Sequence, residues 1–220
     1  MAWSLLFSFM AWILHVSFVV LASDGDPLQD FCVADNSTQI TVNGFPCKPV
    51  SDVDATDFAS SLLRQPGNED PRVGSAVNLA TAMTFPALNT LGISISRIDY
   101  RPRGLNPPHT HPRATEVLFV AHGTLLAGFV STSNKLFTQV LHEGDLFVIP
   151  RGLPHFEMNV DDHLPALAIS RFNSQNPGVS RLVSSLFGAD PPLPTEVLQT
   201  AFGIRDRQEL ERIIAGAPTS

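Results

Sequence analysis

The chain is poor in basic side chains, and that shortage excludes one class of function. It has 14 Lys and Arg against 21 Asp and Glu, a formal net charge of −7, and no run of basic residues. A nucleic-acid partner would require a basic surface to neutralise its phosphates, so no such partner is expected. Charged residues make up only 16% of the chain and hydrophobic residues 44%, which argues against disorder and favours one domain with a sizeable core.

Long apolar runs are also scarce, because only residues 1–22 form one. This segment contains no Lys, Arg, Asp or Glu, and Val20 and Ala22 satisfy the small-residue rule for cleavage before Ser23. We therefore expect a signal peptide and a secreted, soluble mature protein that no membrane retains. The segment lacks the usual basic residue and could span a bilayer, so an uncleaved anchor is the alternative.

Cysteine occurs only twice, as Cys32 and Cys47. In an oxidising compartment a pair at this separation should form a disulfide, which would hold down an N-terminal extension, residues 23–50. A loop of this size stabilises the folded state by roughly 3 kcal/mol in the chain-entropy model. Between the cysteines, Asn36-Ser37-Thr38 is the only N-glycosylation sequon, which predicts an exposed loop.

Apolar and polar residues alternate with period two from Leu91 through most of the chain to Arg171, which is typical of strands. Turn residues at His122-Gly123, Ser133-Asn134, Glu143-Gly144 and Asp161-Asp162 separate runs of hairpin length. Many short strands at this spacing predict an all-β sandwich or barrel. Residues 52–84 suggest at most a short helix. The residues expected to face the core are Val117, Phe119, Phe129, Phe147 and Ile149.

After Asn173 the period changes to that of a helix. Apolar residues at positions 179, 182, 183, 186 and 187 form one helical stripe, and prolines then interrupt it. Thr195 is expected to cap a second helix, and Asp206 with Glu209 to begin a third. These short helices must bury their apolar faces, either on their own barrel or on a neighbouring subunit.

The strongest functional signal lies in RGLNPPHTHPRATEVLFVAHG, residues 103–123. His109 and His111 are two positions apart, so an extended chain turns both side chains to one side, whereas a helix would separate them. The flanking prolines exclude a helix. Glu116 is an odd number of positions after His111, so in an unbroken strand its side chain would point to the opposite face. A turn or bulge at residues 112–113 must therefore direct its carboxylate to the side of the histidines. Two imidazoles and a carboxylate make most of a first-row metal site.

A second motif, GDLFVIPRGLPHFEMN at residues 144–159, supplies the expected fourth ligand, His155, at the start of another strand-like run. Glu157 could compete as a ligand but is interpreted as a neighbour of the site or a solvated residue. Four arginines flank the motifs and would either steer an anionic substrate or be solvated charges: Arg101, Arg103, Arg113 and Arg151. The other histidines are interpreted as surface or satisfied core residues: His122, His142 and His163.

These motifs resemble the paired cupin boxes of plant germins and germin-like proteins. PLQDFCVAD, VNGFPCK, NTLGISISRIDYRPRGLNPPHTHPRATE and GDLFVIPRGLPHF match the family pattern, and the likeness extends from about Leu28 almost to the C-terminus. The resemblance implies a cupin jelly-roll β-barrel at residues 51–172, followed by short helices in a C-terminal segment at residues 173–220. It also implies a hexamer built as three dimers and a location in the plant apoplast or cell wall.

The resemblance further implies one manganese ion per subunit, held by His109, His111, Glu116 and His155. Ligand types alone leave iron, zinc, nickel and copper open. Four protein ligands on a six-coordinate ion leave two positions for a small anionic or reactive-oxygen substrate. Superoxide dismutation and a role in defence or stress are the function that the family suggests.

Oxalate oxidation is the other family chemistry, and one residue argues against it. Active oxalate-oxidising germins pair two asparagines beside the metal; Asn106 matches one, but Ser96 occupies the position of the other. A serine offers a single hydroxyl where an amide offers a separate donor and acceptor, so little oxalate oxidase activity is expected. A non-catalytic extracellular binding or wall protein is the alternative function, since auxin-binding and seed-storage relatives share the barrel.

Overall fold

The computed structural model describes residues 30–37 and 44–217. The chain divides into two compact units, Met1–Asp30 and Phe31–Ser220, and the second contains nearly all of the described residues. The expected signal peptide, residues 1–22, lies outside the described residues, as does Thr38 of the sequon. No helix in the described part of the chain is long and apolar enough to cross a membrane.

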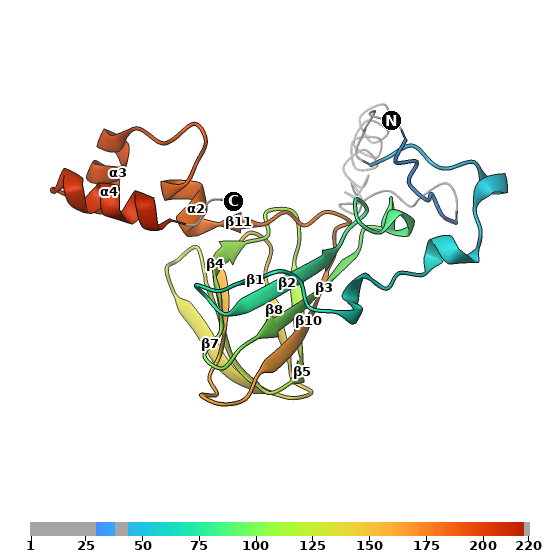
Figure 1. Cartoon of the computed structure of the whole chain (residues 1–220), viewed down its shortest axis with the longest axis horizontal. Coiled ribbons are helices and arrows are strands. Elements are labelled where there is room, and N and C mark those ends of the chain that lie inside the picture. The colour runs from blue at the N-terminus through green and yellow to red at the C-terminus, as the bar shows by residue number, and fades with distance from the viewer. Residues whose placement is uncertain (1–29, 38–43, 218–220) are drawn as a thin grey trace, which may run out of the picture. The chain divides into compact units, whose positions relative to one another are not determined.

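Two antiparallel sheets form the body of this unit (Figure 1). The six-stranded sheet has the order β1 (Glu69–Asp70), β2 (Ser75–Ala80), β3 (Ser94–Tyr100), β10 (Ala166–Phe172), β5 (Glu116–His122) and β8 (Leu146–Ile149). The five-stranded sheet has the order β11 (Ser180–Arg181), β4 (Leu105–Thr110), β9 (His155–Asn159), β6 (Thr124–Val130) and β7 (Leu136–His142). The expected β-rich jelly roll is confirmed.

The sheets share one hydrophobic core because strands such as β3, β9 and β10 alternate between a buried and a more exposed side. In β3 this alternation is strict along the whole strand. The core cluster draws on strands of both sheets, so each sheet covers the apolar face of the other. Its members are Ile98, Tyr100, Leu118, Val120, Leu125, Ala127, Leu141, Ala166 and Ala168.

Two of the expected core residues are on the wrong side of their strand. Val117 and Phe119 are 37% and 39% exposed, because β5 turns Glu116, Leu118 and Val120 inward instead. Side chains alternate between the two faces of a strand, so a strand whose first residue points inward directs its second and fourth residues outward. Ile149 is buried as expected, Phe147 is partly buried against the core, and Phe129 is half-buried.

The segment at residues 52–84 contains more structure than its sequence indicated. Short 3-10 turns occupy η1 (Val50–Asp52), η2 (Ala55–Phe58) and η3 (Leu62–Arg64), and η4 (Pro86–Leu88) follows. Strand β2 was missed, because small or polar residues stand at several of its positions and obscure the alternation. It pairs with β3 along its whole length and so becomes part of the barrel wall.

Three helices follow the barrel: α2 (Leu182–Phe187), α3 (Thr195–Phe202) and α4 (Arg207–Gly216). The first is shorter than its stripe predicted, because residues 180–181 pair with β4 as strand β11. Thr195 is the first residue of α3 and not its cap, a position that Pro194 takes. Asp206 caps α4 as expected, and its Oδ1 accepts from the Gln208 N–H at 2.8 Å.

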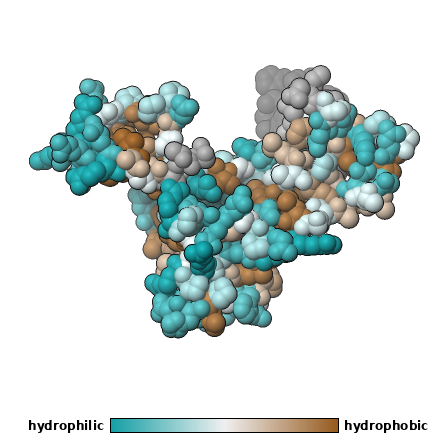
Figure 2. All heavy atoms as spheres, in the orientation of Figure 1, coloured by the Kyte–Doolittle hydropathy of each residue, from teal (hydrophilic) through white to brown (hydrophobic). Residues whose placement is uncertain are grey.

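Large apolar side chains remain exposed on these helices, as Figure 2 shows among the hydrophilic residues of the same region. They are Val183, Leu186, Val197, Phe202, Ile213 and Ile214. Within the described residues, only Leu198 of α3 and Leu210 of α4 are buried apolar residues of these two helices. The helices therefore bury only part of their apolar faces within one chain.

The N-terminal extension is tied to itself by the expected disulfide between Cys32 and Cys47, whose Cα atoms are 4.8 Å apart. A β-bridge between Ala34 and Cys47 accompanies it. Asn89 is fully buried beneath this loop, where its Nδ2 donates to the Phe45 carbonyl at 2.8 Å and its Oδ1 accepts from the Phe45 N–H at 3.0 Å. Asn36 is exposed in a turn, as a glycosylated residue must be.

Truncating the core should destabilise the barrel measurably. Leu118 is fully buried between the sheets, so Leu118→Ala should lower the free energy of unfolding by about 2–5 kcal/mol, through lost burial and the cavity left behind. Leu164→Ala is the matched control, because Leu164 is 60% exposed and its truncation should cost under about 0.5 kcal/mol. Urea unfolding at one protein concentration measures both; equal losses would contradict the assignment of the core.

Candidate metal centre

Four buried polar side chains converge inside the barrel: His109, His111, Glu116 and His155. One ligand atom from each lies within 4.8 Å of the ligand atoms of the others. Two ligands on opposite sides of one ion are separated by about twice a metal–ligand bond, roughly 4–4.5 Å, so this spacing suits a single ion. The four residues that the sequence singled out are therefore brought together as a buried group that could bind a metal.

The pairing of strands explains how distant residues meet. His109 near the end of β4 stands opposite His155 at the start of β9, and their ring centroids are 4.1 Å apart. His111 follows β4 directly, and the expected turn at residues 112–113 reverses the chain. Glu116 then opens β5 in the other sheet. The group thus joins the two sheets at one end of the barrel.

Backbone carbonyls orient all three imidazoles. The Nδ1 atoms of His109, His111 and His155 lie 2.9, 2.6 and 2.8 Å from the carbonyl oxygens of Pro107, Gly178 and Leu153. A carbonyl only accepts, so each Nδ1 carries a proton and donates it. In a neutral ring this leaves the lone pair on Nε2, the atom that faces the group, which is the tautomer of a metal-binding histidine.

The carbonyl that orients His111 comes from a loop with a strict backbone requirement. Gly178 has φ +68°, in the left-handed region, and a Cβ there would lie 2.8 Å from the Arg113 guanidinium. Arg113 in turn donates from Nε to the Asn176 carbonyl at 2.8 Å. This arginine, which the sequence suggested for substrate steering, therefore braces the loop behind His111.

The electrostatics of the group suit a cation. Burial, and then the neighbouring imidazoles of His155 and His111, lower the pKa of His109 from 6.5 to about 3, so the ring is neutral at physiological pH. Burial alone would raise the pKa of Glu116, but the facing His111 and His155 rings outweigh it and lower that pKa. The Glu116 carboxylate is therefore ionised.

Two atoms of the group are buried and have no hydrogen-bond partner among the described residues: Glu116 Oε2 and His155 Nε2. They lie 3.3 Å apart, and His111 Nε2 is 3.2 Å from the same oxygen, yet neither contact has hydrogen-bond geometry. Buried polar atoms without partners cost free energy. A bound metal ion would satisfy both, so the residues present fit a metal.

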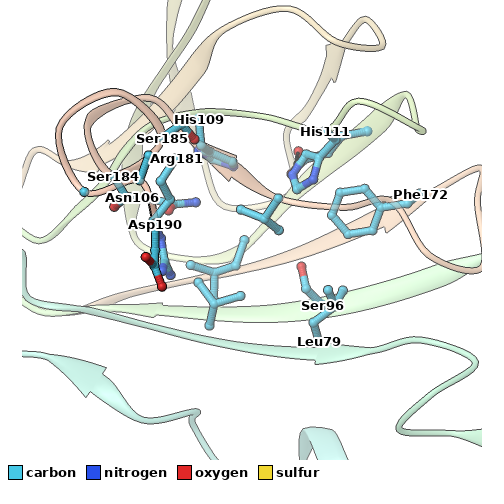
Figure 3. A pocket seen from close by; sticks show the side chains of 16 residues that line it. Leu79, Ser96, Asn106, His109, His111, Phe172, Arg181, Ser184, Ser185 and Asp190 are labelled. Carbon is cyan, nitrogen blue, oxygen red and sulfur yellow. Dashed lines mark ion pairs between the residues drawn. The ribbon is translucent and has the colours of Figure 1, made fainter. Parts of the chain in front are cut away.

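The group opens into a pocket of about 420 Å³ (Figure 3). His109, His111 and Glu116 line it, together with the buried Ser96 of β3. Apolar side chains from β2, β3 and β10 form much of the remaining wall, including Phe172, whose ring centroid is 4.6 Å from that of His111. A ligand in this pocket would lie beside a metal held by His109, His111 and Glu116.

Asn106 also lines the pocket, and a buried acid holds its amide. Its Nδ2 donates to Glu157 Oε2 at 2.8 Å. Burial, and then the charge of Glu116, raise the pKa of Glu157 well above its usual range. The structure places Glu157 outside the four-residue group, on the same inward side of β9 as His155.

The other charged residues that the sequence noted lie elsewhere. His122, His142 and His163 are exposed, as expected. Arg101 pairs with Glu69, Arg103 with Asp162, and Arg151 Nε donates to the Pro112 carbonyl. The arginine that does line the pocket, Arg181, was missed, because nothing in its local sequence relates it to either histidine motif.

A family model described as Cupin matches residues 61–210. A germin-like protein of Arabidopsis thaliana, subfamily 2 member 4, is 50% identical over 207 residues, covering 94% of this chain and 94% of that protein. This chain is a germin-like member of the cupin family.

Solved structures resemble this germin-like chain as well. A recombinant oxalate oxidase in complex with glycolate has a TM-score of 0.83 at 45% identity, covering 88% of this chain and 97% of that chain. Peruvianin-I, described as a cysteine peptidase from Thevetia peruviana latex, has a TM-score of 0.69 at 40% identity, covering 73% and 98%. Both cysteines of the germin-like chain form its disulfide, which leaves no thiol for nucleophilic catalysis.

The low pKa of His109 predicts a pH dependence for the metal-free protein. Below pH 6.5 the unfolded chain binds a proton at His109 that the folded chain takes up only near pH 3. The free energy of unfolding should therefore fall as pH drops through this window, by up to about 1.4 kcal/mol per pH unit from this group. In His109→Asn, which keeps a donor for the Pro107 carbonyl, that part of the slope should disappear.

Urea unfolding with a chelator, from pH 7 to pH 4, measures the slope. His163→Asn serves as the control, because His163 is exposed and lies outside the buried group. A His109→Asn slope equal to that of the wild type would contradict the assignment of a neutral, buried ring.

Proposed function

We propose that this germin-like protein is secreted to the plant apoplast or cell wall, binds one manganese ion per subunit, and dismutates superoxide in defence or stress. The observation that supports metal binding most directly is the buried group itself. Three oriented Nε2 atoms and an ionised carboxylate lie close together, and two of these atoms have no hydrogen-bond partner in the described part of the chain. Manganese is the ion that the germin resemblance implies.

The chemistry that such an ion would supply is one-electron exchange, taking an electron from one superoxide and giving one to the next, which together with two protons from solvent yields dioxygen and hydrogen peroxide. The chain contributes the four ligands and the enclosure around them. His109, His111 and His155 would bind through Nε2, and Glu116 would offset part of the ionic charge. Asn106, held by Glu157, lines the pocket through which substrate would approach.

A homo-oligomer, namely the hexamer of three dimers, completes the proposal. Exposed apolar residues on the outer side of the barrel support it, among them Val117, Phe119, Leu136, Leu146 and Val148. Larger exposed apolar surfaces are typical of subunit contacts. The helices α2, α3 and α4 add the apolar side chains named above, which one chain leaves exposed.

A non-catalytic extracellular binding protein is the second candidate, and the size of the pocket favours it. Its volume of about 420 Å³ is much more than a diatomic substrate requires. It falls within the roughly 300–1,000 Å³ of ordinary small-molecule sites. In this case the metal would serve ligand capture or stability.

Loss of a metal ligand should lower both the manganese content and the superoxide dismutase activity. His109→Ala should lose most of its manganese and its dismutase activity, because one of three imidazole ligands is gone. His142→Ala, at an exposed histidine, should retain both. Metal analysis and an assay on the same mature samples test this; a fully manganese-loaded wild type without activity would reject the enzyme and favour the binding protein.

Ser96 should limit oxalate oxidation. Its Oγ is buried and no residue of the described segments forms a hydrogen bond with it, and because Ser96 lines the pocket, a side chain here can reach a ligand. The wild type should release little hydrogen peroxide from oxalate, and Ser96→Asn should release more, because the amide restores a separate donor and acceptor. Ser133→Asn, on an exposed turn, is the control. Oxalate turnover by the wild type as fast as by Ser96→Asn would contradict this role.

A further inference from the structure

The two sulfur atoms of the disulfide between Cys32 and Cys47 lie in different surroundings. Cys32 is only 2% exposed, whereas Cys47 is an exposed residue. A thiolate breaks a disulfide by attacking one sulfur, and the other sulfur leaves with the bonding electrons; which sulfur is attacked depends on access. Exposure therefore directs an attacking thiolate to Cys47 Sγ and makes Cys32 the leaving group.

The leaving sulfur already lies beside a hydrogen-bond donor. Asn89 is fully buried, and its Nδ2 donates to Cys32 Sγ at 3.4 Å. Its amide is held in place by the two hydrogen bonds with the backbone of Phe45. A hydrogen bond to an anion is stronger than one to a neutral acceptor, so this donor favours the thiolate that the exchange releases. The buried side of the disulfide thus contains a group that stabilises negative charge.

The described part of the loop closed by this disulfide packs against a segment that orients a candidate metal ligand. A Cβ at Gly44 would lie 3.5 Å from Gln175 Nε2, so the two residues are close neighbours. Gln175 Oε1 also accepts from the Thr90 N–H. Three residues further along the chain, the Gly178 carbonyl accepts from the His111 ring. A short stretch of backbone therefore connects the disulfide loop to the support of His111.

We propose that Cys47 is a site of thiol–disulfide exchange, through which a dithiol reductant loosens the hold on His111. A thiolate of the reductant attacks Cys47 Sγ, the bond between the two cysteines breaks, and Cys32 leaves as a thiolate that takes a proton from solvent. The second thiol of the reductant then displaces Cys47 from the mixed disulfide. Two electrons thus pass from the dithiol to the chain, and the reductant becomes a disulfide.

The effect on the metal rests on the proposed metal binding, whereas the exchange site itself does not. Breaking the bond removes the constraint that closes the loop, so the packing of Gly44 against Asn89 and Gln175 should weaken. Loss of a group that orients a metal-binding histidine lowers metal affinity by about 10–100-fold. Because His111 is reached through several residues, the lower end of that range, about tenfold, is expected.

The site of attack is tested on the full-length mature protein with glutathione as the probe. After incubation under native conditions, remaining thiols are blocked with iodoacetamide, and peptide mass spectrometry locates both adducts. Glutathione should be on Cys47 and the iodoacetamide adduct on Cys32, in about tenfold excess over the reverse arrangement. Equal amounts of the two arrangements, or a reaction that occurs only after denaturation, would reject the site.

Asn89→Asp tests the donor beside the leaving sulfur. The change keeps the size of the side chain but replaces the donating amide with a carboxylate, so the Cys47 adduct should form about tenfold more slowly. Asn134→Asp makes the same chemical change at an exposed position and should react as the wild type does. A variant at position 89 that is folded by circular dichroism and reacts at the wild-type rate would overturn the role given to this amide.

Hydrogen exchange measures the effect on the His111 support without any metal. In protein kept reduced by dithiothreitol, the amides of Thr90 and Arg113 should exchange severalfold faster, because both donate to residues 175–178. The Val120 amide, which donates to the Asp145 carbonyl, should exchange as before. Unchanged exchange at Thr90 and Arg113 would reject the coupling, and so would an equal increase at Val120.

Manganese affinity is compared without reductant, using a variant that combines Cys32→Ser with Cys47→Ser. It should bind manganese about tenfold more weakly than the wild type. Gln175→Ala should weaken binding similarly, and adding it to the double variant should change little, because both interrupt one connection. Gln139→Ala, at an exposed glutamine of β7, is the control and should bind normally. A folded double variant with wild-type affinity would contradict the coupling.

Failure of this proposal can be distinguished from failure of the proposed function. Manganese content and superoxide dismutation of the oxidised wild type test the function in the absence of any thiol. If that protein takes up no manganese, the proposed function fails. Glutathione mapping and hydrogen exchange then still decide the exchange site and its coupling to the His111 support, since neither measurement requires a metal.

Discussion

The candidate site depends on the antiparallel pairing of β4 with β9. This pairing sets His109 against His155 and carries both rings to one end of the barrel. Their Nδ1 protons are then committed to the carbonyls of Pro107 and Leu153, each two residues before the histidine that it orients. Because these hydrogen bonds are local, the strand pairing and the choice of tautomer are satisfied together. The result is a buried cluster of Nε2 lone pairs that meet few hydrogen-bond donors inside the protein.

Strand β5 of the other sheet completes the cluster, and this changes which of its own residues point inward. Glu116 occupies an inward position of β5 that an apolar residue would fill in an ordinary barrel. An inward carboxylate shifts the parity of the strand, so Val117 and Phe119 become outward residues. The feature that serves the site thus also leaves apolar side chains on the outer surface. In a germin-like oligomer these two consequences would be linked, since the exposed strand face is a surface that a second subunit can cover.

The pocket joins parts of the chain with very different local signals. The histidine motifs could be interpreted from the sequence because two imidazoles at i and i+2, with prolines beside them, allow few backbone conformations. The turn at residues 112–113 and the capping of α4 by Asp206 followed from similarly local chemistry. Strand β2, which contributes Val77 and Leu79 to the pocket wall, carried no such signal. Its buried residues are largely small, and its conformation follows from pairing with β3.

The sequence by itself determined the class of fold, the four candidate ligands, the disulfide partners and the surface position of the remaining described histidines. Each of these follows from the types and spacing of residues within a short stretch of the chain. Only the tertiary structure decided which face of β5 is inside, that Glu157 holds Asn106, and that Arg181 stands beside His109. These depend on strand register and on contacts between segments far apart in the chain, for which local composition carries no signal. The role of Arg113 also depends on tertiary structure, because the loop that it supports is distant in the sequence and folds back onto it.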